Sequence, residues 1–133
     1  MGLEWEVNSK WWIDWIFLLT SHKDLDVWKE AIVLAKLIYT FINRLPDTEK
    51  FGMISQIKRA CVSVPLNIAE GSGRKSDKET IQFCHIALGS LVEVETLLVL
   101  SNELFNVDDN KTNEQLENCK KLLLGFIRYL KNK

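Results

Sequence analysis

The sequence predicts an all-α fold, specifically an antiparallel up-down four-helix bundle. Apolar residues recur at helical spacings of three and four through four segments, and turn residues separate those segments. No segment longer than a few residues alternates with the period of a strand. A chain of 133 residues, 47% hydrophobic and 26% charged, is typical of one globular domain with its own core. We place the bundle domain at residues 23–133.

The first helix is predicted over residues 26–44. Its apolar residues form two neighbouring stripes, with further apolar residues beside them, which is more than a single core needs. One stripe is Trp28, Ile32, Ala35, Tyr39 and Ile42, and the other is Ala31, Leu34, Ile38, Phe41 and Leu45. Pro46 then breaks the helix, and Asp47 or Thr48 is expected to cap the next one.

The second helix is predicted over residues 48–70, and Pro65 within it implies a kink. Its core stripe is Ile54, Ile57, Cys61, Val64 and Ile68. We expect Gly71 to end this helix in the left-handed conformation, and Ser76 with Glu79 to form a capping box for the next. The glycines therefore belong to a turn between helices and not to a phosphate-binding nucleotide loop, which would follow a strand.

The third helix is predicted over residues 77–104 and is apolar on nearly all sides, so it must be covered from several directions. Gly89 and Ser90 in its middle permit a neighbouring backbone to approach closely. Thr112 and Gln115 are expected to cap a fourth helix. The apolar stripe of that helix is Leu116, Cys119, Leu123, Phe126 and Leu130. Because the first and third helices carry more apolar surface than one bundle can bury, we predict a homo-oligomer.

A polar stripe follows the second helix opposite its apolar face. It consists of Gln56, Arg59, Ser63, Asn67 and Glu70. The stripe could be an exposed face, a binding surface or a polar seam between subunits. We favour a seam in which Gln56, Ser63, Asn67 and Ser90 fix the register of the subunits, as buried polar residues do in coiled coils. Glu70 is expected to pair with Arg59 or with an arginine of a neighbouring subunit.

Cations are concentrated in one part of the chain. Residues 50–78 contain six cations and two carboxylates, whereas the whole chain has a net charge of -1. This asymmetry indicates one basic face. The candidate nucleic-acid-binding residues are Lys58, Arg59, Arg74, Lys75 and Lys78.

No set of reactive residues has the spacing of a catalytic or metal site. Cys84 and His85 are adjacent, so on a helix their side chains point about 100° apart. The three cysteines fall in apolar helical segments and are expected to be buried, reduced thiols, as in a cytoplasmic protein. We therefore predict a protein that is not an enzyme and has no metal or cofactor.

Residues 1–22 form an apolar extension that precedes the bundle. The run WWIDWIFLL at residues 11–19 is too short to span a bilayer and is interrupted by Asp14. It has no small-residue cleavage site of a secretory signal. Its aromatic residues allow a membrane-surface segment, but we favour an arm that packs on its own subunit or on a neighbouring one, with no membrane span.

Several motifs together resemble a known family, the four-helix-bundle proteins encoded in intervening sequences of bacterial 23S ribosomal RNA genes. The motifs are DLDVWKEA at residues 24–31, P-x-x-E-x-F-G at residues 46–52, SQIKRACVSVPLNIAEGSGR at residues 55–74 and IALGSLVEVET at residues 86–96. The chain departs from the family at Arg59-Ala60, where many relatives carry paired basic residues.

The resemblance implies an antiparallel bundle assembled as a ring-shaped homopentamer, and it suggests nucleic-acid binding. The same fold occurs in accessory proteins of diversity-generating retroelements, which partner a reverse transcriptase. Two functions therefore stay open. The first is binding of structured RNA or DNA through a basic surface repeated around the ring. The second is a structural or protein-adaptor oligomer, for example a partner of a reverse transcriptase, without nucleic-acid binding.

Overall fold

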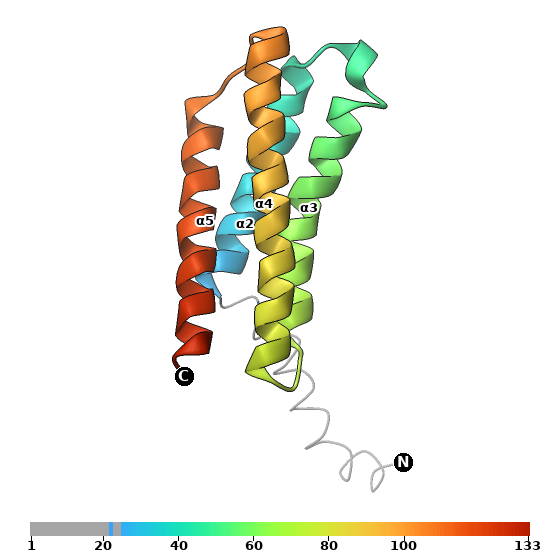
Figure 1. Cartoon of the computed structure of the whole chain (residues 1–133). Coiled ribbons are helices and arrows are strands. Elements are labelled where there is room, and N and C mark those ends of the chain that lie inside the picture. The colour runs from blue at the N-terminus through green and yellow to red at the C-terminus, as the bar shows by residue number, and fades with distance from the viewer. Residues whose placement is uncertain (1–21, 23–24) are drawn as a thin grey trace, which may run out of the picture.

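The computed structural model describes His22 and residues 25–133, and over these residues it is all helical, without strands. The predictions for the extension at residues 1–22 therefore lie outside the described residues, apart from His22. Four long helices form a bundle (Figure 1). They are α2 (Asp26–Phe41), α3 (Met53–Ser72), α4 (Asp77–Phe105) and α5 (Asn110–Lys131).

Each helix contacts two neighbours. α2 packs against α3 and α5, and α4 packs against the same two helices. The helices thus stand at the corners of a square, so the side formed by α2 and α3 is opposite the side formed by α4 and α5 (Figure 1).

The bundle has two distinguishable ends. At one end, the turn between α3 and α4 lies near the C-terminus, where Lys133 Nζ is 3.5 Å from Asp77 Oδ1. We call this the turn end; it is the lower end in Figure 1. At the other end, the guanidinium of Arg44 donates to the backbone oxygen of Asp108 at 2.9 Å, which joins the α2–α3 and α4–α5 connections. We call this the loop end.

The second predicted stripe of α2 forms its core face, and the first does not. The residues Ala31, Leu34, Ile38 and Phe41 are buried, whereas Trp28, Ile32 and Ala35 are only half-buried and Tyr39 is 45% exposed. Ile42 of the first stripe is nevertheless buried, in the 3-10 helix η2 (Ile42–Arg44) that follows α2, and Trp28 and Ala35 pack against the core. The first stripe therefore lies at the edge of the core. Fully buried residues from all four helices meet at the centre, among them Leu34, Ile57, Leu91 and Leu123.

α3 differs from its prediction at both ends. It begins at Met53, after a short 3-10 helix η3 (Asp47–Glu49), and it continues through Pro65, which is buried inside the helix. It also continues past Gly71 to Ser72. No glycine in the described residues has a positive φ, so the prediction of a left-handed terminator at Gly71 is wrong.

Gly71 has a different role, which is to let α4 approach. A Cβ atom at this position would lie 2.7 Å from the Cβ of Phe83 and 3.2 Å from the backbone oxygen of Thr80. The hydroxyl of Thr80 in turn donates to the backbone oxygen of Gly71 at 2.8 Å. The glycine is therefore a packing residue at the α3–α4 contact, and the turn begins after it.

The predicted capping box of α4 is confirmed for Ser76, and the predicted cap of α5 is wrong. Ser76 Oγ accepts from the backbone N–H of Glu79 at 3.2 Å. α5 is capped by Asp109 and not by Thr112. The side chain of Gln115 instead donates across the bundle to Glu30 of α2, to its backbone oxygen at 2.9 Å and to Oε2 at 2.6 Å.

Replacement of Asp109 by alanine should lower the free energy of unfolding by about 1 kcal/mol, as for other N-caps. Its carboxylate accepts from the N–H and the hydroxyl of Thr112 at 3.0 and 2.6 Å, and these bonds hold its pKa below the ordinary value. Because the folded-state pKa is lowered, this stabilisation is present above the unfolded-state pKa of about 3.9 and is lost as the pH falls through the folded-state pKa.

Urea unfolding at a series of pH values from neutral downward measures this prediction. The difference between the parent and Asp109→Ala should be full at neutral pH and should shrink as the pH falls through the folded-state pKa. Asp108→Ala is the matched control, because the Asp108 carboxylate only accepts an exposed bond from Asn113. An equal loss in both variants would show that the cap is not the cause.

Candidate nucleic-acid interface

The five predicted nucleic-acid-binding cations form two separate groups. Lys58 and Arg59 lie in the loop-end half of α3, whereas Arg74, Lys75 and Lys78 lie at the turn end. The thirteen residues of α3 after Arg59 place Arg74 about 20 Å away at the rise of an α-helix. The structure therefore does not bring all five together on one local surface.

The turn-end group is the denser one. Arg74 Nη2 is 2.7 Å from Glu70 Oε1, and the Arg74 guanidinium lies 4.7 Å from the centre of the Phe83 ring. Glu70 thus pairs with Arg74 of its own chain and not with Arg59, one of its two predicted partners, whereas pairing with an arginine of a neighbouring subunit stays a prediction. Lys75 and Lys78 are exposed beside this pair.

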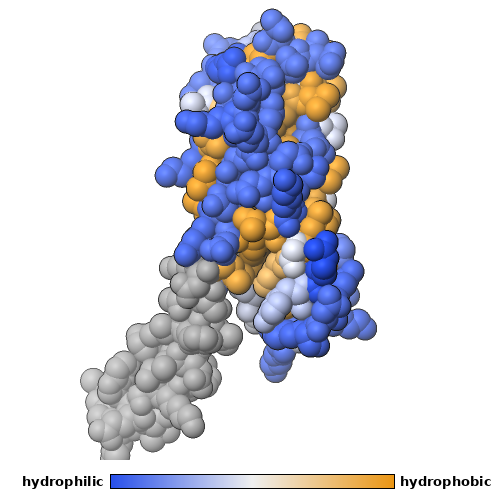
Figure 2. All heavy atoms as spheres, turned by 90° about the vertical axis from the view of Figure 1, so that its left-hand side faces the viewer, coloured by the Kyte–Doolittle hydropathy of each residue, from blue (hydrophilic) through white to orange (hydrophobic). Residues whose placement is uncertain are grey.

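The end of α5 adds cations that sequence reasoning missed. Lys131 and Lys133 follow the last apolar turn of α5, and the contact of Lys133 with Asp77 brings them to the turn end. Figure 2 shows hydrophilic residues at this lower end of the described chain. We call Arg74, Lys75, Lys78, Lys131 and Lys133 the basic end.

Lys58 and Arg59 have more apolar surroundings than the cations at the turn end. Lys58 Nζ lies 5.4 Å from the centre of the Tyr39 ring, which is within the range of a cation–π interaction. Both cations line a groove on the outer side of α3, together with the exposed side chains of Val62 and Leu66. This group resembles the rim of a protein interface more than a phosphate-binding surface.

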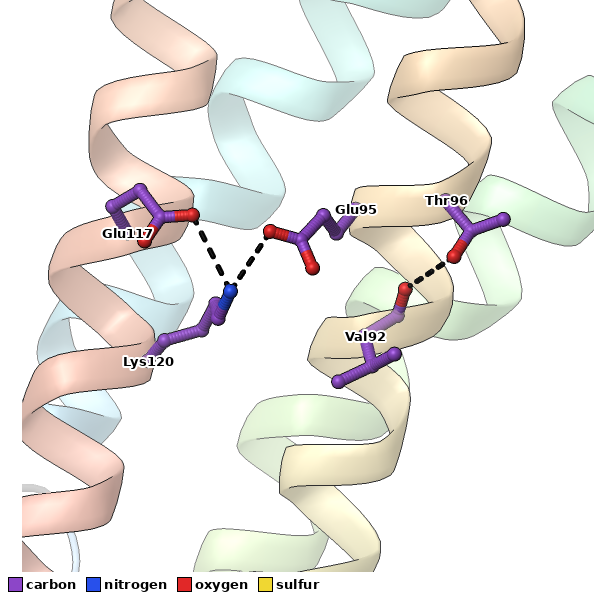
Figure 3. Close-up of polar contacts among 5 residues, drawn as sticks. All are labelled: Val92, Glu95, Thr96, Glu117 and Lys120. Atoms are coloured by element: carbon purple, nitrogen blue, oxygen red, sulfur yellow. Dashed lines mark hydrogen bonds and ion pairs between the residues drawn. The ribbon is translucent and has the colours of Figure 1, made fainter.

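The side formed by α4 and α5 carries the opposite charge. Lys120 Nζ of α5 lies 2.8 Å from Glu95 Oε2 of α4 and 3.4 Å from Glu117 Oε1 (Figure 3). The hydrogen bond from Lys120 lowers the pKa of Glu95, and the bond to Glu95 raises the pKa of Lys120. Nearer the loop end, Glu103 and Asp108 line the same groove, and the Arg44 guanidinium contacts the backbone oxygen of Asp108.

The polar stripe of α3 makes hydrogen bonds within the chain. The hydroxyls of Ser63 and Ser90 are 2.9 Å apart and join α3 to α4. The amide of Asn67 donates to the backbone oxygen and the hydroxyl of Ser63 at 2.8 and 2.9 Å. Gln56, earlier in the stripe, is exposed. Ser63, Asn67 and Ser90 therefore set the register of two helices in one subunit, and a role between subunits stays a prediction.

Comparison with protein families identifies the chain. The sequence model of the 23S rRNA-intervening sequence protein family matches residues 23–125. The chain belongs to this family. A comparison with curated proteins gives no significant match. The matched range contains α2, α3, α4 and most of α5, so Lys58, Arg59 and the turn-end cations of residues 74–78 lie within the part that this family shares.

The cysteines of this 23S rRNA-intervening sequence protein are buried and free, as predicted. Burial raises the pKa of Cys61 and Cys84 to about 11 and that of Cys119 to about 12, with the charge of Glu30 as a second cause for Cys119. Their thiols are therefore protonated at neutral pH and poor nucleophiles. His85 is exposed, whereas Cys84 beside it is buried. No three metal-ligating side chains lie together within the described part of the chain.

The surface of α4 is unusually apolar. By length and composition alone this helix could cross a membrane, a test that core helices of soluble proteins also pass. Only 33% of its most apolar stretch is buried, and its exposed residues include Ile86, Val92, Val99 and Leu104. Exposed apolar residues of this kind are typical of a surface that contacts another molecule.

Proposed function

We propose that this 23S rRNA-intervening sequence protein is a non-enzymatic homo-oligomer that binds structured RNA or DNA through its basic end. The observation that carries the proposal is the gathering of Arg74, Lys75, Lys78, Lys131 and Lys133 at the turn end, in a protein with a net charge of -1. Glu70 and Asp77 at this end pair with Arg74 and Lys133. Duplex nucleic acid carries a charge about every 1.7 Å along its axis, so a compact group of lysines can contact several phosphates. Such contacts read backbone and shape rather than sequence.

The proposal includes an oligomer of antiparallel up-down bundles, arranged in a closed ring of five as the family resemblance implies. The exposed apolar residues of α4 support association. A ring repeats each basic end five times, which turns a weak local surface into a strong field. The protonated, buried thiols support a cytoplasmic location.

Charge reversal at Lys75 and Lys78 tests the proposal. Both side chains are exposed, whereas Arg74 is held by Glu70 and Phe83, so the lysines can be changed without loss of packing. In Lys75→Glu/Lys78→Glu, binding to folded RNA and to duplex DNA should weaken similarly. The slope of log affinity against log salt should fall by about 0.7 to 0.9 for each phosphate that the variant no longer neutralises. Fluorescence titration at several salt concentrations measures both quantities.

Lys111→Glu/Lys121→Glu is the matched control, because it makes the same change of charge on exposed positions of α5 away from the basic end. At about 0.1 M salt, charges more than about 10 Å from the ligand are screened, so the control should bind nearly as the parent does. Equal losses in the two variants would contradict a local site. Parent binding no tighter than about 10⁻⁴ M, the weak end of non-specific affinity, would exclude the proposal.

A protein adaptor, for example an accessory partner of a reverse transcriptase, is the second candidate function. The loop end supports it, because Phe51 is 90% exposed there, with the Lys50 ammonium 5.7 Å from its ring centre. An aromatic side chain in this position is typical of an anchor for a partner protein. An adaptor would not bind folded RNA or duplex DNA in the titration above.

A further inference from the structure

A basic groove lies on the outer side of α3, with Tyr39 of α2 in its wall. Its wall contains Tyr39 and the apolar residues Val62 and Leu66, which are 36% and 63% exposed. Its charged residues are Lys58 and Arg59, and no carboxylate of the described residues lines it.

An acidic groove lies between α4 and α5. Its lining contains Val99, which is 56% exposed, above the buried Leu98 and Leu116. The carboxylates Glu95, Glu103, Asp108 and Glu117 surround this apolar floor. Lys120 is paired with two of the four, so the groove keeps a negative charge (Figure 3). The exposed side chains of Val92 and Leu124 continue the apolar surface toward the turn end.

The two grooves lie on different helices of the bundle and overlap in height. α2 and α3 form one side of the square and α4 and α5 the other. The hydroxyls of Ser63 and Ser90 are 2.9 Å apart, so these residues of α3 and α4 lie at one height. Lys58 and Glu95 both lie five residues, or about 7.5 Å, from them toward the loop end, and Val62 and Val92 lie about 1.5 and 3 Å from them in the same direction. Cations thus stand level with carboxylates, and apolar residues with apolar residues.

We infer that the acidic groove of one subunit receives the basic groove of the next, so that subunits join head to tail. Contact between two copies of the same groove would oppose like charges, whereas contact between the two different grooves pairs Lys58 and Arg59 with carboxylates. A head-to-tail contact closes into a ring when it involves rotation without translation, and the overlap in height is compatible with this condition. The inference rests on the oligomer of the proposed function. It assigns Lys58 and Arg59 to the subunit contact and does not use the basic end for that contact.

Two variants that each block one groove test the inference. Leu66→Glu places a carboxylate in the basic groove, where it would face the neighbour's carboxylates. Val99→Lys places an ammonium in the acidic groove, where it would face Lys58 and Arg59. Both positions are exposed, so the bundle should keep its helicity and cooperative melting, which circular dichroism measures.

Light scattering after size exclusion should show each variant alone as a monomer. An equimolar mixture should form a dimer and nothing larger, because one intact acidic groove and one intact basic groove remain, and they lie on different chains. A monomeric mixture of two folded variants would overturn the inference, and so would the parent mass in either variant alone. The latter result would mean that another surface joins the subunits or that the chain's own residues 1–21 cover the groove.

Val33→Glu is the control, because Val33 is 41% exposed and lines a different groove, shared with Lys111 and Glu114 of α5. It should keep the parent mass, and loss of it would overturn the inference. A charge exchange provides a second measurement. Lys58→Glu/Arg59→Glu should dissociate the oligomer, and adding Glu103→Lys/Glu117→Lys in the same chain should restore its mass. Failure to restore it would contradict the pairing.

These outcomes separate the inference from the proposed function. If the parent is oligomeric and binds nucleic acid but both groove variants keep its mass, only the inference fails. If the groove variants dissociate as expected but the parent does not bind nucleic acid, only the proposed binding fails.

Discussion

Replacement of Gly71 by alanine should lower the free energy of unfolding by about 1 to 3 kcal/mol, the usual cost of overpacking a close contact. The added methyl group would lie 2.7 Å from the Cβ of Phe83, a backbone-anchored atom that cannot rotate away. α3 and α4 must therefore separate, which also strains the 2.8 Å hydrogen bond from the Thr80 hydroxyl to the Gly71 oxygen. Alanine is the better helix former by about 0.5 to 1 kcal/mol, so packing must outweigh propensity.

Gly89→Ala is the matched control, because it makes the same change inside α4, where an added Cβ meets nothing within 4 Å. This variant should gain about 0.5 to 1 kcal/mol in free energy of unfolding. Urea unfolding at one protein concentration measures both variants. A neutral Gly71→Ala would refute the close contact. A lower oligomer mass for Gly89→Ala would support the prediction that a neighbouring backbone approaches Gly89.

Replacement of Leu91 by alanine should have the largest effect on the free energy of unfolding, a loss of about 2 to 5 kcal/mol. Leu91 is 0% exposed at the centre of α4, and the packed residues around it cannot fully close the cavity that a smaller side chain leaves. The loss adds the transfer free energy of the missing carbon atoms to the cost of that cavity.

Leu104→Ala in the same helix is the control, because Leu104 is 62% exposed near the loop end. It should change the free energy of unfolding by no more than about 0.5 kcal/mol. Calorimetric melting at a fixed concentration measures the difference, since association would otherwise shift the melting temperature. Similar losses for the two variants would mean that Leu104 is also buried, by another subunit.

The four helices could be predicted from sequence because their signals are local. Apolar spacing and helix-ending residues act within a few turns, and Ser76 caps α4 through a residue only three positions away. The core face of α2 could not be chosen in this way. Both of its stripes have helical spacing, and only the positions of α3 and α5 decide which one is buried.

Local signals mislead for residues whose roles depend on another helix. Gly71 follows an apolar periodic segment and so has the sequence signal of a terminator, but the nearness of Phe83 explains the glycine. Gln115 has the spacing of a capping residue, but its partner is Glu30, 85 positions away. The bridge of Lys120 to Glu95 also crosses between helices and has no local signal.

The separation of the two groups of cations, in contrast, could have been predicted from the sequence. Arg59 and Arg74 share one basic segment of the sequence, yet the rest of α3 after Arg59, thirteen residues, places them about 20 Å apart. The helical prediction already contained this separation. The charge of the groove between α4 and α5 required the fold, because its carboxylates come from both helices and from the loop between them.

While the bundle is folded, its three buried thiols do not react with reagents in solution. Cys61, Cys84 and Cys119 come from α3, α4 and α5. The reactivity of each thiol therefore measures how far its own helix becomes exposed to solvent. A thiol reagent at neutral pH can modify them only in molecules that have opened. A cysteine introduced on the surface can accordingly carry a fluorescent dye for distance measurements between subunits, with all three native cysteines left in place.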